Sequence, residues 1–245
     1  MEYIHNTEQF QFHNTVVALG KFDGMHKGHQ LIFDELIQYK QLGYQAAVFS
    51  FDRPPLNMLK HKHMRVIYTT NEKIKLLARR GIDIYIEHPF TDEFSHLSPE
   101  DFVIKVLLEK TGMKVLVVGD DCGFGYKRQG NVELLERMSK EYDFKLIVIP
   151  KLELKGEIVS STRIRRLLSE GKVEEANRLM EDPFMICGPV VHGNHMGAEV
   201  LQMPTANQIP LEDKLLPPNG VYVSRIHYKD ETYYGISNVG VKPTI

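Results

Sequence analysis

The stretch TVVALGKFDGMHKGHQ, residues 15–30, joins a short apolar run to a turn with two glycines and to the start of an amphipathic segment. Val-rich runs favour strands, and Gly20 and Gly24 permit a tight turn after the strand. The segment that follows, up to Gly43, has apolar residues at helical spacing. This stretch therefore predicts the strand–turn–helix unit with which many α/β domains begin.

The same alternation continues for more than a hundred residues. Helical segments end at Gly43, Gly81 and Gly112, and glycine is the common residue just past a helix. Further Val/Ile-rich runs, typical of buried parallel strands, lie at 46–51, 82–87, 114–119 and 144–150. The pattern predicts a Rossmann-like parallel sheet, with ligands bound at the carboxyl ends of its strands.

The alternation stops in two steps. From about residue 156 two helical segments follow each other, and after Pro183 the chain changes to Gly- and Pro-rich segments with short β-like runs. We expect two domains, an α/β domain over 1–183 and a small β domain over 184–245.

Composition limits the class of protein. Thirty Lys and Arg against 32 Asp and Glu leave a formal net charge of -2, so no broad cationic field favours nucleic acid as a partner. Two cysteines are too few for a disulfide framework, and the first residues resemble no secretory signal. No apolar run is long enough to cross a bilayer. We expect a soluble, cytoplasmic protein without a membrane partner.

The turn GKFDGMHKGHQ, residues 20–30, carries the strongest chemical signal. His26 and His29 are three residues apart and share one face of the first helical turn, beside free helix N–H groups. Such a place suits a phosphate during phosphoryl or nucleotidyl transfer. The alternatives are a zinc pair or two surface histidines, but a spacing of three is less usual for zinc and no third ligand is near.

A second signal is VSSTRIRRLL, residues 159–168. Hydroxyl side chains at 160–162 cap a helix whose first turns carry Arg163, Arg165 and Arg166. Hydroxyls, backbone donors and guanidiniums together can clamp an anion. Taken alone, the segment fits an ordinary capped, charged helix equally well.

GKFDGMHKGHQ together with VSSTRIR resembles the His-x-Gly-His nucleotidyltransferases, and specifically the bacterial FAD synthetases, the adenylyltransferase module of bifunctional riboflavin kinase/FMN adenylyltransferases. Further segments follow the family order: FSFDRPP (49–55), TTNEKIKLLARRGID (69–83), VVGDDCGFG (117–125) and ICGPVVHG (186–193). The last of these resembles the start of the family's riboflavin kinase barrel, which other His-x-Gly-His enzymes lack.

The resemblance implies that FMN and ATP give FAD and pyrophosphate, with FMN and FAD as substrate and product. Mg²⁺ would be held mainly by the substrate phosphates rather than by protein ligands. By family position, the catalytic residues are His26, His29 and Arg165. The ATP-binding residues would be Gly20, Phe22, Asp23, Gly24, Ser161, Thr162 and Arg163. The flavin or nucleotide cleft would be lined by Phe51, Arg53, Gly119, Asp121, Phe124 and Gly125, although Asp121 could instead be a structural turn acid.

The sequence departs from the family pattern on the flavin side. Pro54 stands where His is usual, and the preceding Arg53 could supply a phosphate-binding group in its place. Cys122 and Gly123 stand where Phe and Arg are usual. Cys122 has no expected catalytic role, because adenylyl transfer needs no thiol.

The C-terminal segment departs further. GAEVLQMPTAN, residues 197–207, keeps the PTAN of the kinase nucleotide motif without its Arg and second Gly, and the family's general base lies beyond Ile245. We therefore expect an FAD synthetase without riboflavin kinase activity, whose incomplete β-barrel-like domain packs on the first domain or on another copy in a homo-oligomer. The alternatives are a bifunctional enzyme, another His-x-Gly-His transferase, and a flavin or nucleotide sensor without turnover.

Overall fold

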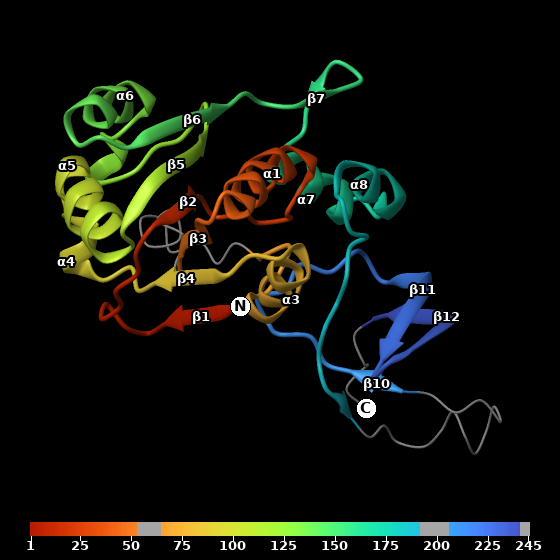
Figure 1. Ribbon diagram of the computed structural model, residues 1–245. Helices are drawn as coiled ribbons and strands as arrows, with labels where there is room; N and C mark the ends of the chain where they lie inside the picture. The colour runs from red at the N-terminus through yellow and green to blue at the C-terminus, as the bar shows by residue number, and fades with distance from the viewer. Residues whose placement is uncertain (53–64, 192–205, 241–245) are drawn as a thin grey trace, which may run out of the picture.

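The computed structural model describes residues 1–52, 65–191 and 206–240 (Figure 1). Its N-terminal part is built on a six-stranded sheet of order β1-β4-β3-β2-β5-β6, and every neighbouring pair in it is parallel. The strands are β1 (Glu2–His5), β2 (Thr15–Leu19), β3 (Gln45–Phe51), β4 (Ile84–His88), β5 (Met113–Gly119) and β6 (Lys145–Ile149). The predicted parallel sheet is confirmed, with β1 as an additional edge strand that the sequence pattern did not reveal.

Helices cover both faces of this sheet (Figure 1). Val16 and Ala18 of β2 pack into one apolar cluster with α1, α3, α7 and α8, whereas Val17 and Leu19 pack into a second cluster with η1 and α6. A strand buried on both faces needs no polar alternation, which explains its continuous apolar run. The helices are α1 (Lys27–Gln41), α3 (Thr70–Arg80), α4 (Asp92–Ser95), α5 (Pro99–Asp101), the π-helical η1 (Phe102–Lys110), the 3-10 turn η2 (Tyr126–Arg128), α6 (Val132–Glu141), α7 (Ser161–Ser169) and α8 (Val173–Leu179).

Local sequence signals fix the ends of α3. Glu72 in the first turn of this helix also contacts the C-terminal part of the chain. Thr69 and Glu72 form a reciprocal capping box at its start, which satisfies two backbone donors. Gly81 ends it in the left-handed conformation, at φ 87°. Both ends are therefore set by residues adjacent in sequence.

After β6 the chain changes character. The hairpin of β7 (Glu153–Leu154) and β8 (Glu157–Ile158) leads into α7. Beyond α8 the described strands are antiparallel: β9 (Val190–Val191) pairs with β10 (Asn207–Gln208), and β11 (Gly220–Tyr228) pairs with β12 (Glu231–Val239). The predicted fold class, an α/β domain followed by a small β region, is confirmed. The exact boundary at residue 184 stays a prediction.

The C-terminal part contacts the α/β domain around Cys187, whose N–H donates to Glu72 of α3, and at residues 213–215. Lys214 forms an isolated parallel bridge with Val66, and Leu215 is buried. The β11–β12 hairpin, by contrast, leaves one apolar face open: Val223 is 91% exposed and Ile236 is 77% exposed. The expected packing on the first domain is thus seen at residues 213–215, whereas a homo-oligomer stays a prediction. Among the described residues, no helix is both long and apolar enough to span a membrane.

Candidate active site

The histidine turn connects β2 to α1 at the carboxyl end of the sheet's central strands. Phe22, Gly24 and Met25 all have positive φ angles, so the backbone turns sharply here. His26 is the N-cap of α1, and its Nδ1 accepts a hydrogen bond from the His29 N–H at 3.3 Å. Because β3 and β5 flank β2 and the chain order reverses there, the turn lies at the topological switch point of the sheet.

The two imidazole rings stack on each other. The ring centroids of His26 and His29 are 3.6 Å apart and the ring planes differ by 19°, while Phe22 contacts His29 edge-on. Burial lowers the pKa of His26 to about 4 and the pKa of His29 well below its usual value. Both rings are therefore neutral at pH 7, each with one N–H able to donate to an anionic oxygen.

Asp23 ties this turn to the second predicted segment. One carboxylate oxygen accepts the N–H groups of Ile67 at 2.9 Å and Tyr68 at 3.2 Å. The other pairs with the Arg165 guanidinium at 2.6 Å, and the Ser161 hydroxyl donates to the Asp23 carbonyl. Residues about 140 positions apart in the chain are thus brought together, as the phosphate-site prediction requires.

The remaining residues of the predicted clamp are arranged less uniformly. The Ser160 hydroxyl caps α7 by accepting the Arg163 N–H at 3.3 Å, and Thr162 is exposed. Arg163 points to Glu157 of β8, with a 2.8 Å ion pair, and not to the histidine turn. The structure therefore brings Arg165 into contact with the histidine turn, whereas Arg163 pairs with Glu157 instead.

The predicted cleft residues fall into two groups, one at the end of β5 and one in the second apolar cluster. Gly119 ends β5, and the charge of the Asp121 carboxylate that follows slightly opposes the lowering of the His26 pKa by burial. Asp121 is largely exposed and lies 3.3 Å from the Lys151 ammonium. Phe51 and Phe124 belong to the second apolar cluster, where both pack on Phe102.

Gly125 and Cys122 have structural explanations. Gly125 has a φ of +70°, and a Cβ there would lie 2.7 Å from the Pro99 backbone. Burial raises the pKa of the Cys122 thiol to about 12, in keeping with the expectation that it has no catalytic role. Arg53 and Pro54 lie outside the described residues.

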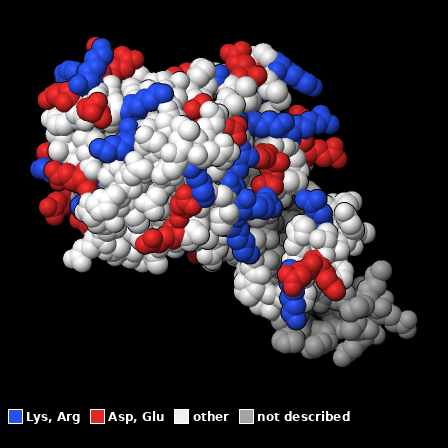
Figure 2. Space-filling model, viewed as in Figure 1, with Lys and Arg blue, Asp and Glu red and all other residues white. Residues whose placement is uncertain are grey.

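Three cations near the turn were missed by sequence reasoning. Lys21 lies within the turn, and burial lowers its pKa, with the charges of Arg128, Lys73 and Arg165 acting in the same direction and Asp23 opposing them. Lys21 stands inside the motif and could have been noticed, but Lys73 and Arg128 come from α3 and η2 and carried no signal of their own. Together these groups make the turn locally cationic, although acidic and basic side chains are interspersed over the face shown in Figure 2.

The donor set at the turn resembles a polyphosphate site more than a metal site. In the described part of the chain, no three His, Cys, Asp or Glu side chains are placed to hold a metal ion. The groups that converge on the turn are neutral imidazoles, a guanidinium and ammonium groups, all of which donate hydrogen bonds to anionic oxygens.

Comparison with known proteins places the chain in one family. A family model described as FAD synthetase matches residues 8–163, and a model described as riboflavin kinase matches residues 180–245. Proteins named bifunctional riboflavin kinase/FMN adenylyltransferase from Buchnera aphidicola subsp. Schizaphis graminum and Listeria monocytogenes are 38% and 35% identical, over 98% and 99% of this chain and 78% of their own length.

A solved structure is similar over almost the whole chain. A Streptococcus pneumoniae protein named a macrolide-efflux protein superposes with a TM-score of 0.86 at 30% identity, covering 99% of this chain and 79% of that protein. The likeness supports the two-part architecture described above.

Proposed function

This chain belongs to the FAD synthetase family of bifunctional riboflavin kinase/FMN adenylyltransferases, and on that basis we propose that it transfers AMP from ATP to FMN, giving FAD and pyrophosphate. The observation that carries the proposal is the stacked pair His26 and His29 at the start of α1, joined through Asp23 to Arg165. Neutral donors and a guanidinium meet there at the carboxyl end of a parallel sheet, where an adenylyltransferase needs its polyphosphate.

The reaction needs no covalent nucleophile from the protein. An FMN phosphate oxygen attacks the α-phosphorus of ATP, and the bond from that phosphorus to the bridging oxygen breaks as pyrophosphate leaves on the opposite side. The protein's work is to align two polyanions and to stabilise charge on the transferring group. His26 and His29 would donate N–H bonds to the phosphate oxygens, and Arg165 would bind the departing pyrophosphate.

The start of α7 would hold the outer phosphates. Ser161 and Thr162 lie in the first turn of this nine-residue helix, where backbone N–H groups and the helix dipole favour an anion. Asp23 would act by holding Arg165 and the turn, since both of its oxygens already accept hydrogen bonds from the protein. Arg163 would have to leave Glu157 to reach the nucleotide.

Mg²⁺ would enter with ATP. The ion usually binds phosphate oxygens, waters and one or two carboxylates, and the exposed Asp121 beside the histidine turn fits such a secondary contact. When bound, it would neutralise charge on the polyphosphate. The flavin would lie toward Phe51, Phe124 and Gly125, on the side of the second apolar cluster.

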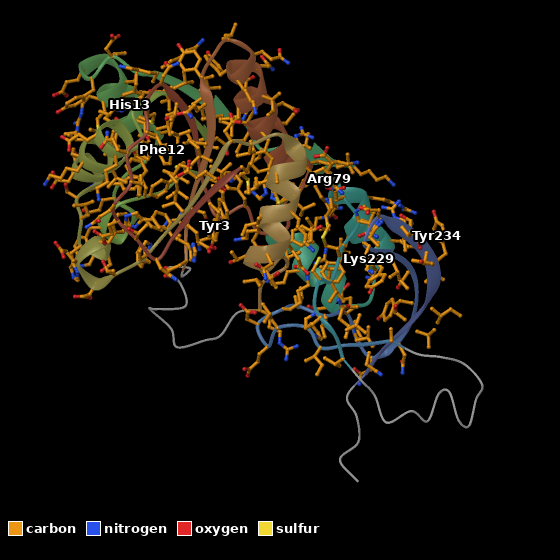
Figure 3. The ribbon with its side chains drawn as sticks, turned by 60° about the horizontal axis from the view of Figure 1, so that its bottom comes forward. Tyr3, Phe12, His13, Arg79, Lys229 and Tyr234 are labelled. Carbon is orange, nitrogen blue, oxygen red and sulfur yellow. The ribbon has the colours of Figure 1, made fainter. Side chains whose placement is uncertain are left out.

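A coupled assay tests the proposal. The protein, FMN, ATP and Mg²⁺ should yield FAD and pyrophosphate in equal amounts over repeated turnovers. Replacing His26 by Ala should lower kcat roughly 10²- to 10³-fold, because a donor to the developing charge is lost. His13→Ala is a suitable control, because this exposed histidine precedes β2 at the opposite end of the strand (Figure 3). A His26→Ala variant with the full rate would contradict the mechanism, and flavin and ATP binding without turnover would indicate a sensor.

Riboflavin kinase activity is the second candidate function. The riboflavin kinase family model matches residues 180–245, and the relatives are named as bifunctional enzymes. The bifunctional alternative is therefore better supported than the expected enzyme without kinase activity. Of the PTAN residues of the kinase nucleotide motif, Pro204 and Thr205 lie outside the described residues, and Asn207 begins β10. An assay with riboflavin, ATP and Mg²⁺ distinguishes the two readings. FMN formed over repeated turnovers supports two activities, and no FMN formation supports adenylyl transfer alone.

A further inference from the structure

Lys214 is a buried cation with no part in the proposed chemistry. It lies in the C-terminal region and is 2% exposed. Its ammonium group donates to three acceptors, each at 2.6 Å: the carbonyls of Ile67 and Met185 and the carboxylate of Glu72. An ammonium group has three donors, so each of them has a partner here.

Glu72 is shared between the two parts of the molecule. It is fully buried, and the oxygen that pairs with Lys214 also accepts the Thr69 N–H of the α3 capping box at 2.9 Å. Its other oxygen accepts the Cys187 N–H at 2.7 Å. One ion pair thus connects the start of α3 to two separate segments of the C-terminal region. In Figure 3, α3, marked by Arg79, lies between the sheet and the hairpin that carries Lys229 and Tyr234.

A short path of backbone contacts leads from this ion pair to the histidine turn. The Val66 N–H donates to the Asp213 carbonyl at 2.7 Å, and the Leu215 N–H donates to the Val66 carbonyl at 2.8 Å. The next two residues, Ile67 and Tyr68, donate their N–H groups to Asp23. Asp23 in turn holds Arg165.

We propose that Lys214, supplied by the riboflavin kinase-like region, is a positioning residue for adenylyl transfer. By fixing residues 66–68 it sets the place of the Asp23 carboxylate, and through it the Arg165 guanidinium that would receive the leaving pyrophosphate. The inference rests on the proposed function and adds that the adenylyltransferase site is completed by the other region of the chain.

The energetic cost of burying the Lys214–Glu72 pair favours a positioning role over a contact that only holds the two regions together. Burying an ammonium and a carboxylate costs several kcal/mol per ion before their attraction is counted, so an apolar contact would join two regions as well or better. What the ion pair provides is direction, since one hydrogen bond of the Lys214 ammonium holds the Ile67 carbonyl while the other two fix that ammonium on Glu72 and Met185. A misplacement of about 1 Å in a catalytic group can lower a rate roughly 100-fold.

The test compares the buried Lys214–Glu72 pair with a more exposed pair that also combines a carboxylate and a backbone carbonyl on one ammonium. The double variant Lys214→Met with Glu72→Gln removes both charges, so that no buried charge is left unpaired. Glu72→Gln alone is a second variant, which removes the counter-charge but keeps an amide oxygen that can accept from Lys214. The control is Lys40→Met with Asp83→Asn. There Lys40 bonds the Gly81 carbonyl at 2.7 Å and Asp83 at 2.6 Å, at the amino ends of the strands. FAD formation is followed at a temperature where circular dichroism shows each variant to be folded.

We expect the Lys214→Met/Glu72→Gln variant to lose at least tenfold in kcat, with less than a threefold change in the KM for FMN, and to exchange its Ile67 and Tyr68 amide protons faster. The Lys40 control should keep kcat within twofold. A folded double variant with a wild-type kcat would overturn the inference, because it would make the ion pair an adhesive contact only. If the double variant does not fold, Glu72→Gln is judged by the same criterion. A wild-type protein that forms no FAD would instead refute the proposed function.

Discussion

At the scale of single residues, Asp23 joins segments of the candidate site that are far apart in the sequence. Its two carboxylate oxygens hold the backbone of Ile67 and Tyr68 and the guanidinium of Arg165. The motif GKFDGMHKGHQ predicted its presence at the site but not these partners, which lie 44 to 142 residues away in sequence. Asp23 is therefore best understood as the residue that joins the turn to α7.

An Asp23→Ala substitution tests this interpretation. It leaves two backbone donors and one guanidinium without their acceptor, so we expect the free energy of unfolding to fall by about 3 kcal/mol and kcat for FAD formation to fall at least tenfold. Urea denaturation and the coupled assay measure the two effects. Asp34→Ala is the control, since the more exposed Asp34 carboxylate pairs with Arg80 on the surface. Equal losses in the two variants would argue against a special role for Asp23.

The histidine pair predicts a pH dependence of stability. Burial lowers the pKa of His26 to about 4, below its unfolded value of about 6.5, so the unfolded chain binds a proton that the folded protein does not. Stability is then complete above pH 6.5 and falls as the pH drops toward 4, by roughly 3 kcal/mol from this group. Thermal unfolding between pH 4 and pH 8 measures it. His26→Asn keeps an N-cap acceptor and should show a shallower dependence; an unchanged slope would contradict the assignment.

At the scale of elements, the sequence patterns that were most reliable were those satisfied locally. The runs at 15–19, 46–51 and 114–119 became strands because continuous apolar residues suit a sheet covered on both faces. The edge strand β1 was not predicted, since EYIH at residues 2–5 is half polar and pairs with β4, 82 residues further along the chain. The π-helical form of residues 102–110 also carried no sequence signal.

Gly43 and Gly112, which each follow a helical segment, allow the cost of a positive φ angle to be measured with and without a steric clash. Both Gly43 and Gly112 have positive φ angles, but a Cβ at Gly43 would meet nothing within 4 Å, whereas a Cβ at Gly112 would lie 2.4 Å from the Phe12 carbonyl oxygen. We expect Gly43→Ala to cost about 1 kcal/mol of stability, from φ alone, and Gly112→Ala about 3 kcal/mol or more. Chemical denaturation of both variants gives the comparison, and equal losses would contradict the packing explanation.

At the scale of the whole molecule, the C-terminal region has two kinds of surface. Residues 213–215 are fixed to the α/β domain, whereas Val221, Val223, Tyr234 and Ile236 form an exposed apolar face on the β11–β12 hairpin. Exposed apolar faces of this kind commonly mark surfaces that bind another protein, a ligand or a membrane. The sequence-based prediction of a homo-oligomer is tested by light scattering: a mass of twice the chain or more agrees with it, and a monomer at all concentrations contradicts it.

The sequence by itself determined the parallel α/β architecture, the histidine turn and the family resemblance, because strand runs, glycine turns and helix caps depend on neighbours a few residues away. Tertiary structure alone decided which charged groups act together. Nothing in the sequence pairs Asp23 with Arg165, sends Arg163 to Glu157, or buries Lys214 against Glu72, since these choices depend on how distant segments pack. The physical reason is the range of the forces involved: propensity acts along the chain, whereas burial and ion pairing act across whatever the fold brings together.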